Sequence, residues 1–260
     1  MVKSTFLDKL RRWRKDKEEQ YARAIMEMPA KSTILKSIPF PGVALIMGRR
    51  RFGKTALAHE IANQIHESRG VAAVVHLPPS APQEIKKKIQ KILPDWIMVT
   101  TKKEEWPKRC VVIYDEAAQT AHARRTQSGA AVELDNLIGV SGQREQLLIF
   151  ICHHSKKLDP NVVREVNRII WKQPTYAYQL FERDELTDFT MKASDFFADL
   201  RRGRAYTEPV KKLLKKSSLM LDFDDFRFVT IENKLPPYWT EDLSTLFQDI
   251  SKVGHKAPGY

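Results

Sequence analysis

One stretch near the N-terminus, residues 48–55, constrains this chain more than any other. It reads Gly-Arg-Arg-Arg-Phe-Gly-Lys-Thr and fits the pattern G-x-x-x-x-G-K-[ST] in full. An apolar run over residues 43–47 enters it, as a buried parallel strand would. Leu57, Ile61 and Ile65 then recur every fourth residue and indicate a helix. Strand, glycine loop and helix in this order predict an α/β fold organised around a phosphate-binding loop.

The residue types of this loop explain how it would hold ATP. Gly48 and Gly53 can adopt backbone angles closed to other residues, so successive N–H groups can curl around phosphate oxygens at a helix N-terminus. Lys54 would place a charge on the β and γ phosphates, and the Thr55 hydroxyl would ligate Mg²⁺. The predicted ATP-binding residues are Gly48, Arg49, Arg50, Arg51, Phe52, Gly53, Lys54, Thr55 and Ala56.

The three consecutive arginines of the loop, Arg49 to Arg51, are unusual. They could reach phosphate, DNA or a neighbouring subunit, and a solvated basic surface is an equally good interpretation.

A second signal is the acidic pair that ends the apolar run 110–114. Asp115 could hold the water shell of Mg²⁺, and Glu116 could orient and deprotonate the attacking water. Many strands end in acids, so the pair alone is a weak signal. Together with a complete phosphate loop upstream, it predicts a magnesium site and a catalytic base.

A further apolar run, residues 147–152, ends in His153 and His154. A polar side chain at this strand tip could sense the γ-phosphate or position water, and His153 is the predicted sensor; a structural histidine is the alternative. The two histidines are not expected to share a metal, because adjacent strand residues point to opposite faces.

The rest of the chain alternates strand and helix patterns, which predicts a three-layer fold with a parallel sheet covered on both faces. Three parts are expected: a basic N-terminal helix and connector over 1–38, the ATPase domain over 39–205, and a C-terminal extension over 206–260. The N-terminal helix, expected over residues 1–28, would carry one apolar stripe formed by Phe6, Leu10, Trp13, Tyr21, Ile25 and Met28. After about residue 205 the periodicity is poor, so the extension is interpreted as an arm or lid that ends in a helix over 240–250. Further strands are expected at 71–77, 95–100, 169–171 and 176–181, and helices at 83–93 and within 117–146.

Charge and composition narrow the class of partner. The 260 residues carry a net charge of +12, which favours nucleic acid over membrane as a polyanionic partner. A second basic block lies over residues 201–216. Cys110 and Cys152 flank apolar runs and are expected to be buried and reduced. No apolar run is long enough to cross a bilayer, and no secretion signal is evident, so a cytoplasmic location is expected.

In combination, these motifs resemble the additional-strand P-loop ATPases with a catalytic glutamate, which have a RecA-like fold. Within that group, residues 40–175 resemble the FtsK–HerA superfamily of DNA-pumping motors, which includes genome-packaging ATPases of membrane-containing icosahedral viruses. The resemblance implies a ring, with a hexamer favoured, and ATP bound between subunits. Arg144, just before the strand 147–152, matches the arginine that acts across the subunit boundary, and Arg164 is a second candidate. His153 stands where the family commonly has glutamine or asparagine.

The resemblance also implies a biological setting. It would be a viral genome-packaging motor that contacts DNA without reading its sequence, in the infected host cell or the virion, at a capsid portal or membrane vertex. Two alternatives remain open. One is a phage assembly or export ATPase resembling the zonula-occludens-toxin family, whose members usually carry a membrane-spanning segment. The other is a nucleotide-binding switch without turnover, against which Glu116 argues.

Overall fold

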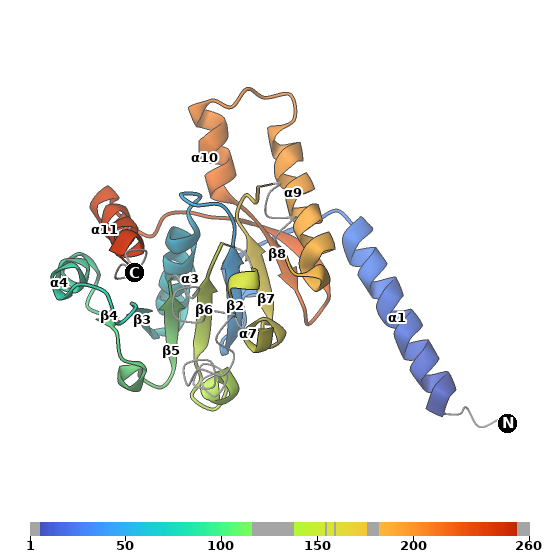
Figure 1. Cartoon of the computed structure of the whole chain (residues 1–260), viewed down its shortest axis with the longest axis horizontal. Helices are drawn as coiled ribbons and strands as arrows, with labels where there is room; N and C mark the ends of the chain where they lie inside the picture. The colour runs from blue at the N-terminus through green and yellow to red at the C-terminus, as the bar shows by residue number, and fades with distance from the viewer. Residues whose placement is uncertain (1–5, 116–137, 154, 159, 176–181, 254–260) are drawn as a thin grey trace, which may run out of the picture.

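The computed structural model describes residues 6–115, 138–153, 155–158, 160–175 and 182–253. Within these ranges the chain forms one nine-stranded sheet in the order β1-β9-β8-β7-β2-β6-β5-β3-β4, flanked by helices (Figure 1). β8 pairs antiparallel with both of its neighbours, and the other pairings are parallel. The strands are β1 (Ala30–Ser32), β2 (Gly42–Met47), β3 (Ala72–His76), β4 (Ile97–Thr100), β5 (Cys110–Tyr114), β6 (Leu147–Ile151), β7 (Arg168–Trp171), β8 (Ser217–Asp222) and β9 (Arg227–Glu232).

The central order of strands confirms the predicted fold class. β6 lies between β2 and β5 and is paired in parallel with both, so a strand separates the one that enters the phosphate loop from the one that ends at Asp115. This is the insertion expected of the additional-strand type. Because β2, β5, β6 and β7 run in the same direction, their carboxyl ends meet at one edge of the sheet. The residues that follow these four strands are therefore neighbours in space.

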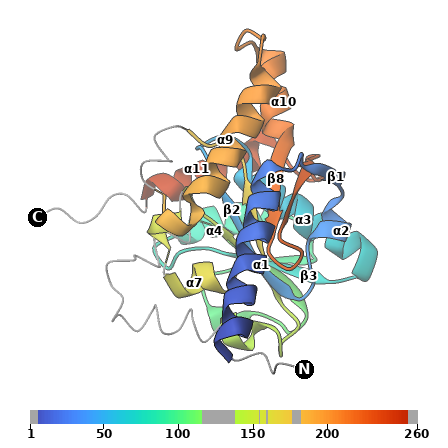
Figure 2. The ribbon, with the colours of Figure 1, turned by 90° about the vertical axis from the view of Figure 1, so that its right-hand side faces the viewer.

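Helices cover both faces of the sheet, as predicted. α2, α3, α4 and α11 pack on one face, and α1, α7 and α9 on the other. Figure 2 shows α1 lying along the outside of the second face. The helices are α1 (Phe6–Met26), α2 (Ile34–Ser37), α3 (Lys54–Arg69), α4 (Gln83–Ile92), α7 (Pro160–Arg164), α9 (Thr187–Arg201), α10 (Glu208–Lys216) and α11 (Glu241–Val253).

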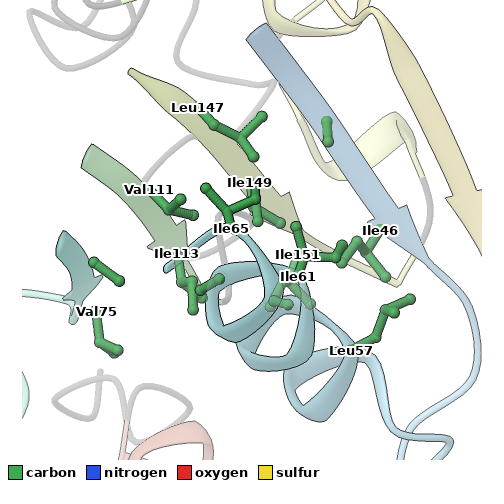
Figure 3. Close-up of a cluster of buried hydrophobic side chains, with 14 of the residues drawn as sticks. Ile46, Leu57, Ile61, Ile65, Val75, Val111, Ile113, Leu147, Ile149 and Ile151 are labelled. Atoms are coloured by element: carbon green, nitrogen blue, oxygen red, sulfur yellow. The ribbon is translucent and has the colours of Figure 1, made fainter. Parts of the chain in front are cut away.

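The apolar strands fill the core from both sides. Leu45 and Ile46 are adjacent in β2, point to opposite faces and are both fully buried, so a continuous apolar run is required here instead of an alternating one. On one face, Leu57, Ile61 and Ile65 of α3 pack against isoleucine and valine side chains of β2, β5 and β6 (Figure 3). This packing fixes α3, and with it the loop that precedes it, against the edge of the sheet.

The segment after residue 205 differs from the arm or lid expected from sequence. α10 is followed directly by β8 and β9, which extend the main sheet beside β7. The short β1, within the proposed N-terminal connector, pairs with β9. Residues 217–232 are therefore part of the sheet, although the proposed domain limits remain predictions. The predicted C-terminal helix is confirmed as α11.

Two other expectations have mixed outcomes. The N-terminal helix is confirmed as α1, where Tyr21 and Ile25 pack on the sheet, but Met28 lies beyond the helix and is 89% exposed, so its place in the apolar stripe was wrong. The strand expected at 176–181 and most of the helix expected within 117–146 lie outside the described residues. Cys110 and Cys152 are free and buried, as predicted.

Candidate active site

The loop between β2 and α3 turns sharply and leads into the N-terminus of α3. Gly48, Arg51 and Gly53 have positive φ angles of 135°, 62° and 79°. At Gly48 a Cβ atom would lie 2.4 Å from the carbonyl oxygen of Lys172, so only glycine fits. The first intrahelical bond of α3 joins Leu57 N to Gly53 O. The N–H groups before Leu57 therefore have no partner within the helix and form a cradle for an anion.

Lys54 lies inside this cradle, with its side chain almost completely buried. Its Nζ donates hydrogen bonds to the carbonyl oxygens of Gly48 and Arg49, at 3.0 and 3.1 Å. The loop thus wraps its own lysine and holds the ammonium group against its first two carbonyl oxygens. A phosphate in the cradle would meet both the dipoles and a full positive charge.

Thr55 and Asp115 meet beside the cradle. The Thr55 hydroxyl donates a 2.8 Å hydrogen bond to Asp115 Oδ2. The two residues are 60 positions apart in the sequence. A hydroxyl and a carboxylate are hard oxygen ligands, and Mg²⁺ is commonly bound by one or two such protein groups together with water and phosphate oxygens. The two side chains therefore fit the predicted role in holding Mg²⁺, which would shield the charge of the bound phosphates.

His153 lies at the back of the loop, between two basic side chains. Arg50 Nε donates to His153 Nε2 at 3.1 Å, so that ring nitrogen acts as the acceptor. His153 Nδ1 then carries the proton and faces Gly48 O at 3.3 Å, while Lys54 Nζ lies 3.3 Å from the same nitrogen. This tautomer follows from the hydrogen-bond network. The histidine is thus in contact with the loop and its lysine, as a sensor would be, although the sensor role remains a prediction.

The other residues of the loop have different surroundings. Arg49, Arg50 and Arg51 are exposed, and the Arg49 guanidinium lies 5.3 Å from the centre of the Phe52 ring. Phe52 is buried in a small cluster with Phe197 of α9 and two residues of α10. Its side chain therefore anchors the loop to these helices, while its backbone remains part of the cradle. Ala56 is buried in the first turn of α3.

Some predicted residues are not brought to this edge. Arg144 precedes β6, and Arg164 precedes β7, so both lie toward the amino ends of the strands. The five residues of β6 span roughly 13 Å from the first Cα to the last. Arg144 Nη2 donates to the carbonyl oxygen of Trp106 at 2.5 Å. Neither arginine is placed to reach the loop of its own chain; a role at a neighbour's site remains a prediction. Glu116 lies outside the described residues.

Lys172 is a residue of this edge that the sequence patterns did not single out. It follows β7 directly, is fully buried, and donates from Nζ to the carbonyl oxygens of Lys215 and Ser217 at 2.5 and 2.9 Å. Burial, with a smaller contribution from the charge of Lys54, lowers its pKa to about 7. The available signal was its position: it is a charged residue at the tip of a strand that neighbours the phosphate-loop strand.

The sequence matches a family model described as "ATPase family associated with various cellular activities (AAA)" over residues 44–174, half of the chain. The chain belongs to this family. The match begins in β2 and ends just after Lys172, so it spans the phosphate loop, Asp115 and His153. The predicted P-loop ATPase identity is therefore confirmed. No curated protein matches the sequence.

The comparison with solved structures found two that are described here. The genome packaging NTPase B204 from Sulfolobus turreted icosahedral virus 2, in complex with AMPPCP, is 14% identical with a TM-score of 0.50, over 75% of this chain and 98% of that chain. The N-terminal domain of zonular occludens toxin from Neisseria meningitidis is 13% identical with a TM-score of 0.33, over 51% of this chain and 77% of that chain. At this level of identity the first likeness concerns the fold alone.

Proposed function

We propose that this AAA-family P-loop ATPase is a motor that hydrolyses ATP with Mg²⁺ to translocate DNA, and that it packages a viral genome into a capsid. The observation that carries the ATPase part is the convergence of Lys54, Thr55 and Asp115 on one glycine loop. The DNA part is supported by the net charge of +12 and by the resemblance of the motifs to DNA-pumping motors. The likeness of fold to a genome packaging NTPase agrees with it.

Each residue of the site has a role in the proposed reaction. The loop N–H groups and Lys54 would bind the β and γ phosphates, and Thr55 and Asp115 would hold Mg²⁺ against them. His153 would respond to the γ-phosphate through its contact with Lys54. Glu116, next to Asp115 in sequence, would take a proton from the attacking water.

A ring arrangement, with a hexamer favoured, would complete the site. An arginine from a neighbouring subunit would stabilise the charge that develops on the γ-phosphoryl group, an effect worth roughly 10³–10⁵ in rate in comparable enzymes. Arg144 is the first candidate and Arg164 the second. Both lie away from their own phosphate loop, which agrees with action on a partner's site.

No helix among the described residues is both long and apolar enough to cross a membrane. The setting proposed here is the cytoplasm of an infected cell or the virion itself, with a capsid portal or membrane vertex as the docking partner.

The test is steady-state ATP hydrolysis by the full chain, measured with and without duplex DNA over a range of salt concentrations. We expect salt-sensitive stimulation by DNA, because phosphate contacts release counterions. We expect Lys54→Ala to lose nucleotide binding or turnover, and Glu116→Gln to retain bound ATP without hydrolysing it. Hydrolysis indifferent to DNA would favour an export ATPase, and tight binding without phosphate release would favour a switch. Normal turnover by Lys54→Ala would refute the assignment of the loop.

A further inference from the structure

Helices α9 and α10 form a hairpin that projects from the sheet (Figures 1 and 2). Its root lies at the edge of the sheet that carries the phosphate loop. On the α9 side, Trp171 Nε1 at the end of β7 donates to Thr190 Oγ1 at 3.2 Å. On the α10 side, the helix runs directly into β8, whose Leu219 pairs with Trp171. The hairpin therefore stands on the active-site edge, and its tip, residues 201–207, points away from the body of the protein.

The hairpin is strongly basic. Residues 195–216 contain seven basic side chains and three acidic ones. Two of the acids are already engaged with basic side chains of the hairpin: Asp199 with Arg202 and Glu208 with Lys211, each at 2.6 Å. The basic residues are Arg201, Arg202, Arg204, Lys211, Lys212, Lys215 and Lys216.

The basic side chains at the tip are exposed to solvent, and the ring of Tyr206 contacts one of them. Arg201, Arg202 and Arg204 are all exposed, and the Arg202 side chain is 82% exposed even though it pairs with Asp199. The ring of Tyr206 lies 4.9 Å from the guanidinium carbon of Arg201 and 5.3 Å from Nζ of Lys211. These contacts hold two cations, one from each side of the turn, beside one ring. Exposed arginines spaced along a projection match a polymer that carries regularly spaced phosphates.

Two contacts connect the root of the hairpin to the phosphate loop. The Phe52 ring of the loop is buried with Phe197 of α9 and with Val210 and Leu214 of α10. Lys172, whose carbonyl oxygen abuts Gly48, donates from Nζ to Lys215 O and Ser217 O at the end of α10. A change in the loop on binding or losing the γ-phosphate would therefore be transmitted to both helices of the hairpin.

We propose that the α9–α10 hairpin grips the phosphate backbone of DNA, and that Phe52 and Lys172 couple this grip to the nucleotide state of the phosphate loop. The inference rests on the proposed function, since it assumes that the substrate of the motor is DNA. It adds the surface that contacts the DNA and the path by which ATP controls it. Because the contacts are ionic and lie at the tip of a projection, the grip does not read base sequence.

The first experiment measures binding of the full chain to a short labelled DNA duplex of mixed sequence by fluorescence anisotropy, with AMPPCP and with ADP, at several salt concentrations. The hairpin variant is Arg201→Gln, Arg202→Gln and Arg204→Gln together. The matched control is Lys36→Gln, Lys87→Gln and Lys91→Gln, which removes the same charge from exposed positions on α2 and α4. Both variants must retain the thermal midpoint of the wild type.

We expect the hairpin variant to bind duplex about tenfold or more weakly and to reduce the salt dependence, d log K/d log[salt], by about 2–3, since each phosphate that the protein neutralises adds roughly 0.9 to this slope. The control should change both quantities much less. Equal reductions in the two variants would mean that only total charge matters and would overturn the inference. So would a hairpin variant that binds DNA normally but loses DNA-independent ATP hydrolysis, because the arginines would then act on nucleotide. If the wild type itself bound no duplex in either nucleotide state, the proposed function would fail first.

The second experiment tests the coupling. In the wild type, duplex affinity should differ between AMPPCP and ADP, and by reciprocity DNA should change AMPPCP affinity by the same factor. Leu214→Ala, or the milder Phe197→Leu, should bring this factor close to one while the protein still binds duplex through its tip. If the ratio of duplex affinities with AMPPCP and ADP were unchanged in both variants, and both were folded, the packing of Phe52 would not couple the hairpin to the phosphate loop.

Discussion

The buried lysine beneath the phosphate loop gives a stability prediction that can be worked out from the structure. Lys172 Nζ has two carbonyl partners, Lys215 O and Ser217 O, and its side chain is removed from water. Its pKa falls from the ordinary value of 10.5 to about 7 because burial penalises the charged form. Replacing it with methionine, of similar length and without charge, removes the titrating group.

The direction of the pH effect follows from proton binding. Between pH 7 and 10.5 the unfolded chain holds a proton on Lys172 that the folded chain has largely released, so folding stability rises with pH in this window. Below pH 7 Lys172 is protonated in both the folded and the unfolded chain. The folded state then carries the full free-energy cost of the buried charge, which is roughly 4–5 kcal/mol for the pKa difference between 10.5 and 7. From pH 7 to pH 9 the change is about 2 kcal/mol. Removing the hydrogen bonds of Lys172 in Lys172→Met shifts stability by an amount that does not depend on pH over this range.

The assay is urea unfolding of wild type and Lys172→Met at pH 7, 8 and 9, followed by circular dichroism. We expect the wild type to gain about 2 kcal/mol relative to the variant across this range. Titrating groups that do not interact with Lys172 cancel in the difference. Lys212→Met, which changes an exposed lysine of α10, should give a flat difference. If the difference in unfolding free energy between wild type and Lys172→Met were also independent of pH, the argument that burial of this ammonium group destabilises the fold would be refuted.

Two further predictions concern arginines. Arg168 Nη1 lies 2.9 Å from Asp222 Oδ1 between paired strands, with side chains 9% and 6% exposed. Arg168→Ala should lower the free energy of unfolding by about 3–5 kcal/mol, because it leaves a buried carboxylate without its ion-pair partner. Arg227→Ala, in a pair whose partners are both 58% exposed, should cost under about 1 kcal/mol, and equal costs would contradict this account. Arg144→Ala should lose hydrolysis when assayed alone but regain part of it when mixed with wild-type subunits. If mixing restored nothing in a correctly folded variant, Arg144 would not act across a subunit boundary.

The candidate site shows which features local sequence can specify. Lys54 and Thr55 belong to a continuous motif, and Asp115 and His153 each follow a long apolar run. Parallel strands bring their carboxyl ends to one edge, so locating the strands was enough to predict that these side chains would meet. The contacts of Thr55 with Asp115 and of Lys54 with His153 agree with that expectation.

The C-terminal part shows where the sequence was harder to interpret. β8 has an apolar run, and β9 has buried apolar residues that do not alternate regularly with polar ones. Between the two strands, Asp222 accepts hydrogen bonds from two backbone N–H groups of the turn. The lysine-rich α10 passes into β8 with no glycine or proline between them, so the usual marks of a boundary are missing. Pairing with β7 supplies the stability that local pattern does not reveal.

By itself, the sequence determined the class of fold and the place of the phosphate loop within it, because a glycine loop, an acid at a strand end and the order of apolar runs are local properties of the chain. Only the tertiary structure decided that the Phe52 side chain is buried against the α9–α10 hairpin, and that Lys172 bonds to carbonyl groups more than 40 residues away. These are long-range contacts, and their energy comes from burial that no short segment can provide. The structure thereby connects the basic α9–α10 hairpin to the phosphate loop.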